Sequence, residues 1–291
     1  MIKKAKLLKK VQNVFILILI IFSIFLFKEL LYKKNHSINP NEIKIHYIDV
    51  GQGDAILVQV NNKNLLIDSG PKSDKKKLTN YLDSIYIPQF DYVIATHPHE
   101  DHIGNMSYII SNYKIINFYS PKVESNTTAF EGMAEALSRK NIKIKILKAN
   151  NKTINLGENT LVEVFSPNLD SYDNLNNYSP IIKIYYGNNS FLFTGDAEEN
   201  VEAEVINKSF NLKSDVLKLG HHGSSTSTSK NFLDKVNPKI TIISVGENNS
   251  YGHPTKETLD KIKNTTVYRT DINRSIIITS DGKTLKSSFK W

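Results

Sequence analysis

Thr96-His97-Pro98-His99-Glu100-Asp101-His102 brings three histidines into six residues, directly after the apolar run FDYVIAT at 90–96. The run predicts a buried strand, and alternation places His97 and His99 on one side of the loop that follows. Asp101 and His102 add a carboxylate and a third imidazole. Such ligands suit zinc and also accept manganese or iron, and with no cysteine in the chain no thiolate competes. The pattern H-x-H-x-D-H therefore predicts a metal site; the alternative is a histidine-rich surface loop.

Short apolar runs with turn residues between them surround this motif and alternate with segments of helical periodicity. The predicted strands cover residues 43–50, 55–60, 64–68, 90–96, 142–147, 160–165, 181–186, 190–194, 216–219, 240–245 and 276–279. The predicted helices cover residues 75–85, 129–140, 198–208, 230–236 and 255–263. Both halves mix the two patterns and no internal repeat is present, which favours one α/β domain with two sheets over residues 43–291.

The basic charge of the chain belongs to its N-terminus. Eight lysines and one glutamate in residues 1–34 contribute +7 of the formal net charge of +8. Residues 35–291 are therefore almost neutral, and the overall charge is poor evidence that the folded part binds nucleic acid.

Residues 11–27 contain only three polar side chains and have lysines on both sides. At about 1.5 Å per residue, a helix continuing to residue 32 could span a hydrocarbon core about 30 Å thick. We therefore predict a cytoplasmic basic tail and single-pass anchor over 1–34, a polar linker over 35–42, and an extracellular domain at the cell membrane. A cleaved signal peptide is the alternative, although residues 28–38 lack a small-x-small cleavage site.

The segment 96–102 resembles the metal-binding motif of the metallo-β-lactamase-fold hydrolases. Three other segments resemble that family in the same order: LLIDSG at 65–70, FLFTGD at 191–196 and LKLGHHGS at 217–224. The resemblance covers about residues 43–280. It implies an α/β fold, a four-layer αβ/βα sandwich, preceded here by the N-terminal transmembrane helix.

Within that family, the chain is similar to the hydrolase domain of ComEC-type competence proteins. The similar elements are YIDVGQGDA at 47–55, the HHGS segment and YGHP at 251–254. The polytopic channel of those proteins has no counterpart in this sequence, so we do not expect DNA uptake by this chain alone.

The resemblance implies two divalent metal ions, with zinc as the first expectation and manganese as the second. The implied ligands are His97, His99, Asp101, His102, Asp196, His221 and His222. Asp68 is expected behind them, as a hydrogen-bond acceptor that orients the histidine loop. Because adjacent residues cannot both point one way, we expect only one of the two neighbouring histidines to be a ligand.

One departure from the family concerns the first metal. No histidine occurs from residue 103 to residue 220, so His97, His99 and Asp196 are its only expected protein ligands. Asn177 and Ser179 stand near the expected position and are predicted to contact the metal or a phosphate; an ordinary polar loop is the alternative.

Other residues have predicted roles around the metals. Ser224 is predicted as a substrate contact, although its serine- and threonine-rich segment also suits a loop before a helix. His253 is predicted to bind phosphate or act as a general acid, and Asp101 to orient the attacking water. His36 and His46 have no partners in sequence and are expected at the surface or in packing.

The expected activity is hydrolysis of a phosphodiester by metal-activated water, with the protein acting as a phosphodiesterase or DNA nuclease linked to DNA uptake or processing. The expected partners are DNA or an envelope polymer as substrate, and the membrane. Two alternatives remain open: an esterase acting on the phosphorylcholine of teichoic acid, and a non-catalytic DNA-binding module of an uptake assembly.

Overall fold

The computed structural model describes residues 12–27, 39 and 41–290, and the chain divides into two units, residues 1–37 and 38–291. Residues 12–27 form a helix with exposed apolar side chains. Within the described residues, no helix has the length and hydropathy needed to cross a membrane. The predicted tail, the flanks of the predicted anchor, most of the linker and His36 lie outside the described residues, so these assignments stay predictions.

The first sheet of the second unit has eight strands in the order β14-β13-β1-β2-β3-β4-β5-β6. The strands are β1 (Ile43–Tyr47), β2 (Ile56–Val60), β3 (Lys63–Ile67), β4 (Phe90–Ile94), β5 (Ile115–Ser120), β6 (Ile144–Ile146), β13 (Ser275–Ser280) and β14 (Leu285–Lys290). Pairing is antiparallel from β14 to β3 and parallel from β3 to β6. The parallel register places the carboxyl ends of β3 and β4 side by side.

The second sheet has six strands in the order β12-β11-β10-β9-β8-β7. The strands are β7 (Thr160–Val164), β8 (Ile182–Tyr186), β9 (Asn189–Phe193), β10 (Val216–Lys218), β11 (Ile240–Ile243) and β12 (Thr266–Arg269). Strands β9 to β12 are parallel, so their carboxyl ends meet at one edge.

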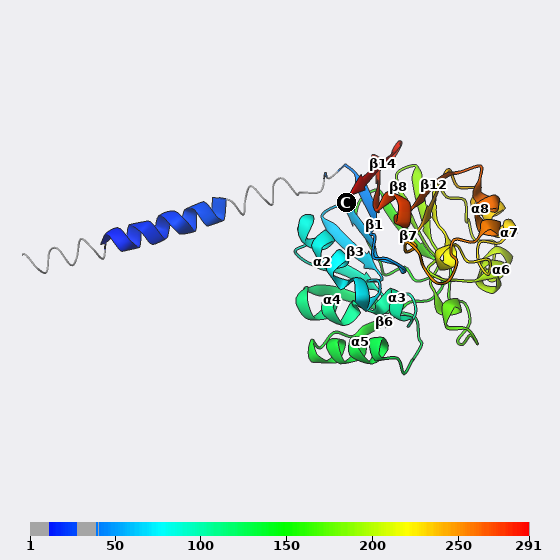
Figure 1. Ribbon diagram of the computed structural model, residues 1–291, viewed down its shortest axis with the longest axis horizontal. Coiled ribbons are helices and arrows are strands. Elements are labelled where there is room, and N and C mark those ends of the chain that lie inside the picture. Colours follow the sequence, from blue (N-terminus) through cyan, green and yellow to red (C-terminus); the bar gives the residue numbers. More distant parts are fainter. Residues whose placement is uncertain (1–11, 28–38, 40, 291) are drawn as a thin grey trace, which may run out of the picture. The chain divides into compact units, whose positions relative to one another are not determined.

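Helices cover the outer face of each sheet, as Figure 1 shows. The first sheet carries α2 (Lys75–Ser84), α3 (Glu100–Ile103), α4 (Met106–Asn112) and α5 (Thr128–Arg139), and the second carries α6 (Glu199–Asn207), α7 (Lys230–Val236) and α8 (Lys256–Ile262). A short α9 (Thr270–Asn273) precedes β13.

Three apolar clusters hold these layers together. Side chains of both sheets, such as Ile45 and Ile184, pack in the central cluster. Leu66 packs with Leu78 of α2 on one outer face, and Leu217 packs with Val201 of α6 on the other. Strands that are buried on both faces read as nearly continuous apolar runs, as the sequence shows here. The four layers confirm the predicted α/β sandwich.

Candidate metal centre

Asp68 organises the histidine loop that follows β4. Its fully buried carboxylate accepts hydrogen bonds from the Thr96 backbone N–H at 2.8 Å and from the Thr96 hydroxyl at 2.6 Å. His102 donates from Nδ1 to the same carboxylate at 2.7 Å. Since Nδ1 holds the proton, Nε2 of His102 offers its lone pair to the space in front of the loop. This is the position predicted for Asp68.

The second histidine segment forms the 3₁₀ turn η3 (Gly220–Gly223), directly after β10. His221 and His222 have φ values of 48° and 54°, in the left-handed region that residues other than glycine rarely adopt. The turn carries Nε2 of His221 to 3.8 Å and Nε2 of His222 to 3.5 Å from Asp196 Oδ2. The expectation that adjacent histidines could not both face the site was therefore wrong, because two consecutive left-handed residues break the alternation that it assumed.

Four side chains from three chain segments converge in front of these turns. Nε2 of His102 lies 3.3 Å from Nε2 of His222 and 3.2 Å from Asp196 Oδ2. Asp101 Oδ2 lies 3.2 Å from Nε2 of His222. One ligand atom from each of Asp101, His102, Asp196 and His222 lies within 4.8 Å of the others. Four of the seven predicted ligands thus meet, although 120 residues separate the two histidines.

The chemistry of these atoms fits a divalent cation. His222 donates from Nδ1 to the Ser244 carbonyl at 2.9 Å, just as His102 donates from Nδ1 to Asp68. In the neutral rings both Nε2 atoms are therefore lone-pair acceptors, and two such acceptors 3.3 Å apart do not bond each other unless a proton or a metal ion lies between them. Asp196 Oδ1 is also buried without a hydrogen-bond partner. Two imidazole nitrogens and two carboxylates form a ligand set that divalent cations such as zinc or manganese accept.

The electrostatics of the cluster favour positive charge at its centre. Burial opposes a charged His102, but the carboxylates of Asp196, Asp101 and Asp68 outweigh burial and raise its pKa well above the ordinary value. Burial also opposes a charged Asp196, but His102 and His222 hold its pKa well below the usual range. A compact group of anions that attracts a proton in this way also attracts a metal ion.

His97 and His99 form a looser second half of the site. Nε2 of His97 lies 3.0 Å from Nδ1 of His99 and 3.8 Å from Asp196 Oδ2. Ser179 fills the space behind them: its hydroxyl lies 3.2 Å from Nδ1 of His97 and accepts from the Asp196 backbone N–H at 3.1 Å. His97 and His99 are not part of the tight four-residue group. A second metal in this half stays a prediction.

An open cleft of about 370 Å³ leads to the cluster. The side chains that line it are Gln52, His99, Glu100, Asp101, Asp196, His221, His222, Tyr251 and His253. Sequence reasoning missed Gln52, Glu100 and Tyr251, although the first and last belong to segments that resemble ComEC-type domains. His253 lines the cleft, and its predicted role stays a prediction; burial, followed by the neighbouring His221 and His222, lowers its pKa.

The three predicted substrate contacts do not line the cleft. Asn177 is buried and accepts from the Glu198 backbone N–H at 3.1 Å, and Ser179 is fully buried. Ser224 lies close behind η3, where its hydroxyl accepts from the Thr226 backbone N–H at 3.2 Å. Internal hydrogen bonds thus occupy all three polar side chains. Contact between them and a substrate stays a prediction, which this geometry does not favour.

A buried ion pair behind the cluster was not predicted. Lys218 Nζ on β10 lies 2.5 Å from Asp54 Oδ2, and both side chains are almost fully enclosed. Asp54 ends the Gly51-Gln52-Gly53-Asp54 turn, whose backbone packs against the histidine loop. A Cβ on Gly53, which has a φ of 143°, would collide with the Asp101 carbonyl oxygen. The pair therefore links the two sheets next to His222.

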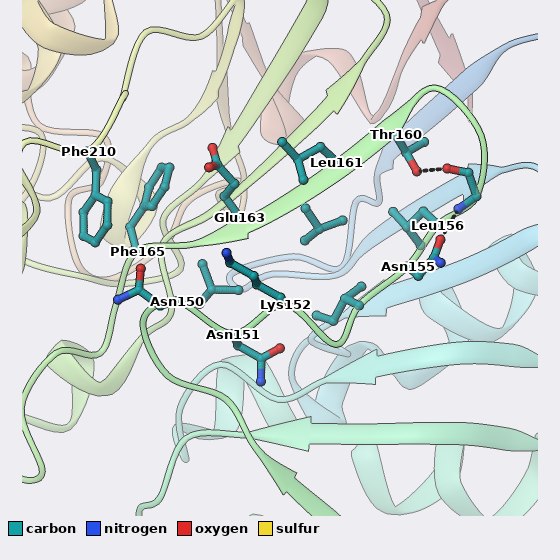
Figure 2. Close-up of a pocket in the computed structure, with 14 residues that line it drawn as sticks. Asn150, Asn151, Lys152, Asn155, Leu156, Thr160, Leu161, Glu163, Phe165 and Phe210 are labelled. Carbon is teal, nitrogen blue, oxygen red and sulfur yellow. Dashed lines mark hydrogen bonds between the residues drawn. The ribbon is translucent and has the colours of Figure 1, made fainter.

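A larger cavity of about 600 Å³ lies elsewhere, between β7 and the preceding loop (Figure 2). Asn150, Asn151, Lys152 and Glu163 contribute its polar groups, and Phe165 and Phe210 lie at one end. The described lining contains no histidine and only one carboxylate. It therefore lacks the convergent ligands of the smaller cleft.

Comparison with known proteins gives a consistent result. A family model described as the Metallo-beta-lactamase superfamily matches residues 48–247. The chain is 32% identical over 256 residues to ComE operon protein 3 of Bacillus subtilis (strain 168), covering 81% of this chain and 33% of that protein. It is 26% identical over 246 residues to Competence protein ComA of Neisseria gonorrhoeae, covering 82% and 33%. The chain thus spans about a third of the length of these curated relatives.

A solved structure supports the fold. The metallo-beta-lactamase fold protein YhfI from Bacillus subtilis superposes with a TM-score of 0.56 at 13% identity, covering 82% of this chain and 99% of that chain. At this identity the likeness concerns the fold alone.

Proposed function

Because this chain belongs to the metallo-beta-lactamase superfamily, we propose that it is a metal-dependent phosphodiesterase that acts on DNA and is tethered to a membrane. The observation that carries the proposal is the convergence of Asp101, His102, Asp196 and His222, three of which line an open cleft. Volume alone would not select this cleft, because the larger cavity lacks such ligands.

The chain's own groups have distinct parts in this chemistry. Divalent metal ions, when bound, supply Lewis acidity and lower the pKa of water. Asp68 and the Ser244 carbonyl fix the proton of His102 and His222 on Nδ1 and so keep each Nε2 ready to bind a cation. Asp101, which lines the cleft, would orient the attacking water by accepting a hydrogen bond from it.

His253 stands on the other wall of the cleft. Its ring lies 5.5 Å from the ring of His221, centroid to centroid, and its Nδ1 has no hydrogen-bond partner. The His253 ring lines the cleft, so we assign it to hydrogen bonding with the leaving-group oxygen.

A phosphodiester substrate is supported by the relatives. ComA is by name a competence protein, and the region similar to it covers 82% of this chain. The cleft is open rather than enclosed, as a polymer substrate requires. About two thirds of the length of these relatives lies outside the match.

The test uses the purified full-length chain in detergent micelles. Metal content is measured first, and the loaded protein is then offered single-stranded DNA, double-stranded DNA, bis-p-nitrophenyl phosphate and p-nitrophenyl phosphorylcholine. We expect turnover of bis-p-nitrophenyl phosphate and DNA. Metal-loaded protein that is inert on every substrate would refute catalysis and favour a binding module; a preference for p-nitrophenyl phosphorylcholine would replace DNA by an envelope phosphodiester.

The proposed tether is the apolar helix around residues 12–27, with the hydrolase domain outside the cell. Its exposed apolar side chains and the flanking lysines support this arrangement. Cell fractionation should recover the full chain with membranes, and protease added to intact spheroplasts should digest the domain. A domain that is protected in intact spheroplasts but digested after lysis would place it in the cytoplasm.

A further inference from the structure

Tyr251, at the mouth of the cleft, is the most exposed large apolar side chain among the described residues, with 67% of its surface accessible. Single exposed apolar side chains are common and need no explanation. This one differs because it lines the cleft that contains the candidate metal centre. A ligand that contacts this side chain from within the cleft would present an aromatic or apolar face to it.

The loop that carries Tyr251 is fixed by one side chain. Asn249 donates from Nδ2 to the carbonyl oxygens of Gly246 and His253, at 3.0 and 2.6 Å. Its Oδ1 accepts from the backbone N–H groups of Tyr251 and His253, at 3.2 and 3.1 Å. Gly246 is in turn held by Gln52, whose Oε1 accepts its N–H at 3.0 Å. The ring is therefore presented to solvent by an ordered backbone, which lowers the entropy lost on binding.

Aromatic rings form a path from the cluster to this exposed ring. Nε2 of His221 lies 3.8 Å from Asp196 Oδ2, and its ring centroid lies 5.5 Å from that of His253. The His253 ring stacks with the Tyr251 ring at 5.8 Å, with 25° between the ring planes. One face of the Tyr251 ring thus packs against the His253 ring. The exposed surface of Tyr251 remains available to stack with a planar group of a ligand.

The charge of the cleft indicates which flat group this is. No lysine or arginine is among the described residues that line it, whereas Glu100, Asp101 and Asp196 are. A polyanion therefore gains little from protein cations along this cleft, and contacts with its bases carry more weight. Every nucleobase has a π-face that stacks on an aromatic side chain.

Resting on the proposed function, we infer that Tyr251 is the stacking platform for an unpaired nucleobase next to the scissile phosphodiester. The substrate of the cleft is then a single strand or a frayed end, because a base inside a duplex cannot turn out onto the ring without loss of its pairing. A quaternary ammonium group is recognised by several aromatic faces that form a cage. Tyr251 is the only tyrosine, phenylalanine or tryptophan in the described lining of the cleft.

The experiment compares two oligodeoxynucleotides on the full-length, metal-loaded chain. One is an ordinary fluorescent single strand and the other has abasic tetrahydrofuran units throughout. Binding is measured by fluorescence anisotropy and cleavage by steady-state kinetics. The variants are Tyr251→Phe, which keeps the ring, Tyr251→Leu, which removes it, and Ile272→Ala, which removes an equally exposed apolar side chain outside the cleft.

We expect Tyr251→Leu to weaken binding and raise KM for the ordinary strand about 5- to 100-fold, with kcat little changed. Tyr251→Phe and Ile272→Ala should behave as the wild type, and the abasic strand should not respond to Tyr251→Leu. Equal losses on both strands, or no loss on the ordinary strand, would overturn the inference. A loss confined to p-nitrophenyl phosphorylcholine would assign the ring to a quaternary ammonium group instead.

Failure of the proposed function gives a different result. In one outcome, the wild type binds the ordinary strand better than the abasic strand, Tyr251→Leu abolishes this preference, and neither strand is cleaved. This result would support base stacking on Tyr251 and refute the proposed nuclease activity. In the other outcome, the chain cleaves both strands at the same rate and Tyr251→Leu has no effect. This result would support the phosphodiesterase activity and refute base stacking on Tyr251.

Discussion

Two cavities of the described part of the chain differ both in size and in the side chains that line them. The cavity beside β7 has about 600 Å³ and the cleft above the cluster about 370 Å³. The larger one is lined by amides, aliphatic side chains and one carboxylate. The smaller one is lined by four histidines and two aspartates, and the Nε2 atoms of His221 and His222 lie 3.2 to 3.8 Å from aspartate oxygens. Convergence of ligand atoms, rather than volume, therefore marks the candidate centre.

The difference arises from where each cavity lies in the sheets. The carboxyl ends of β3, β4, β9 and β10 bring four loops to one edge, because the strands of each pair are parallel neighbours. The larger cavity lies along β7, an edge strand with an antiparallel neighbour, where no strand ends meet. Parallel topology thus gathers functional side chains, as is general for the strand ends of α/β sheets.

The sharpest test replaces one carboxylate by an amide in each cavity. Asp196→Asn keeps the shape but removes the charge that faces His102, His222 and His97. We expect loss of bound metal and a fall in kcat/KM on bis-p-nitrophenyl phosphate of more than about 100-fold, since even indirect partners of metal ligands cost 10- to 100-fold. Glu163→Gln is the matched control and should retain both properties. Reversal of these outcomes would move the catalytic site to the larger cavity.

Metal removal should distinguish the same two variants by stability. If the metal is present at about 100 times its dissociation constant, it contributes about 2.7 kcal/mol, and dialysis against a chelator should lower Tm by roughly 5 to 10 °C. Glu163→Gln should show the same decrease and Asp196→Asn almost none. An equal decrease in Asp196→Asn, measured by differential scanning fluorimetry, would mean that the stabilising ion binds elsewhere.

The larger cavity should affect stability without affecting turnover. Phe210 stacks on Phe165 with ring centroids 4.7 Å apart and 21° between the planes. Phe210→Leu should therefore lower the free energy of unfolding by about 1 kcal/mol in urea titrations and leave kcat/KM unchanged. A fall in activity at unchanged stability would give this cavity a part in catalysis.

A histidine outside both cavities provides the smallest test. His46 is buried on β1, with Nδ1 2.8 Å from the Tyr81 hydroxyl, and burial lowers its pKa from 6.5 to about 3. Because the folded-state pKa lies below the unfolded value, neutral His46 contributes stability that is present above pH 6.5 and is lost as pH falls towards 3. From pH 7 to 6, the free energy of unfolding should fall by about 0.7 kcal/mol more in the wild type than in His46→Gln. Parallel urea-midpoint curves would contradict this assignment.

Most of the architecture and the ligand set could be predicted because both depend on local patterns. Short apolar runs and helical spacing located most elements, and the residues that follow β4 and β9 gave His97, His102 and Asp196 directly. The three missed strands have weaker patterns: Asn117 interrupts the apolar run of β5, the four residues of β12 are all exposed or half-buried, and β14 is a largely exposed strand with polar residues at four of six positions. His46, expected at the surface or in packing, is a packing residue.

The remaining features depend on contacts between distant segments. The local sequence does not predict the left-handed conformation of His221 and His222, because residues other than glycine adopt that conformation only when the surrounding structure imposes it. The pairing of Asp54 with Lys218 likewise requires the docking of one sheet on the other. Local patterns also could not show that Asn177, Ser179 and Ser224 turn away from the cleft, since polar loops serve internal hydrogen bonds and ligands equally well.

The separation of 120 residues between His102 and His222 has a consequence for biogenesis. During synthesis from the N-terminus, the first half of the ligand set appears long before the second. A nascent chain that ends before η3 has Asp101, His102 and Asp196 but lacks His222, so its four-residue ligand group is incomplete. Completion of this group therefore requires synthesis at least as far as η3.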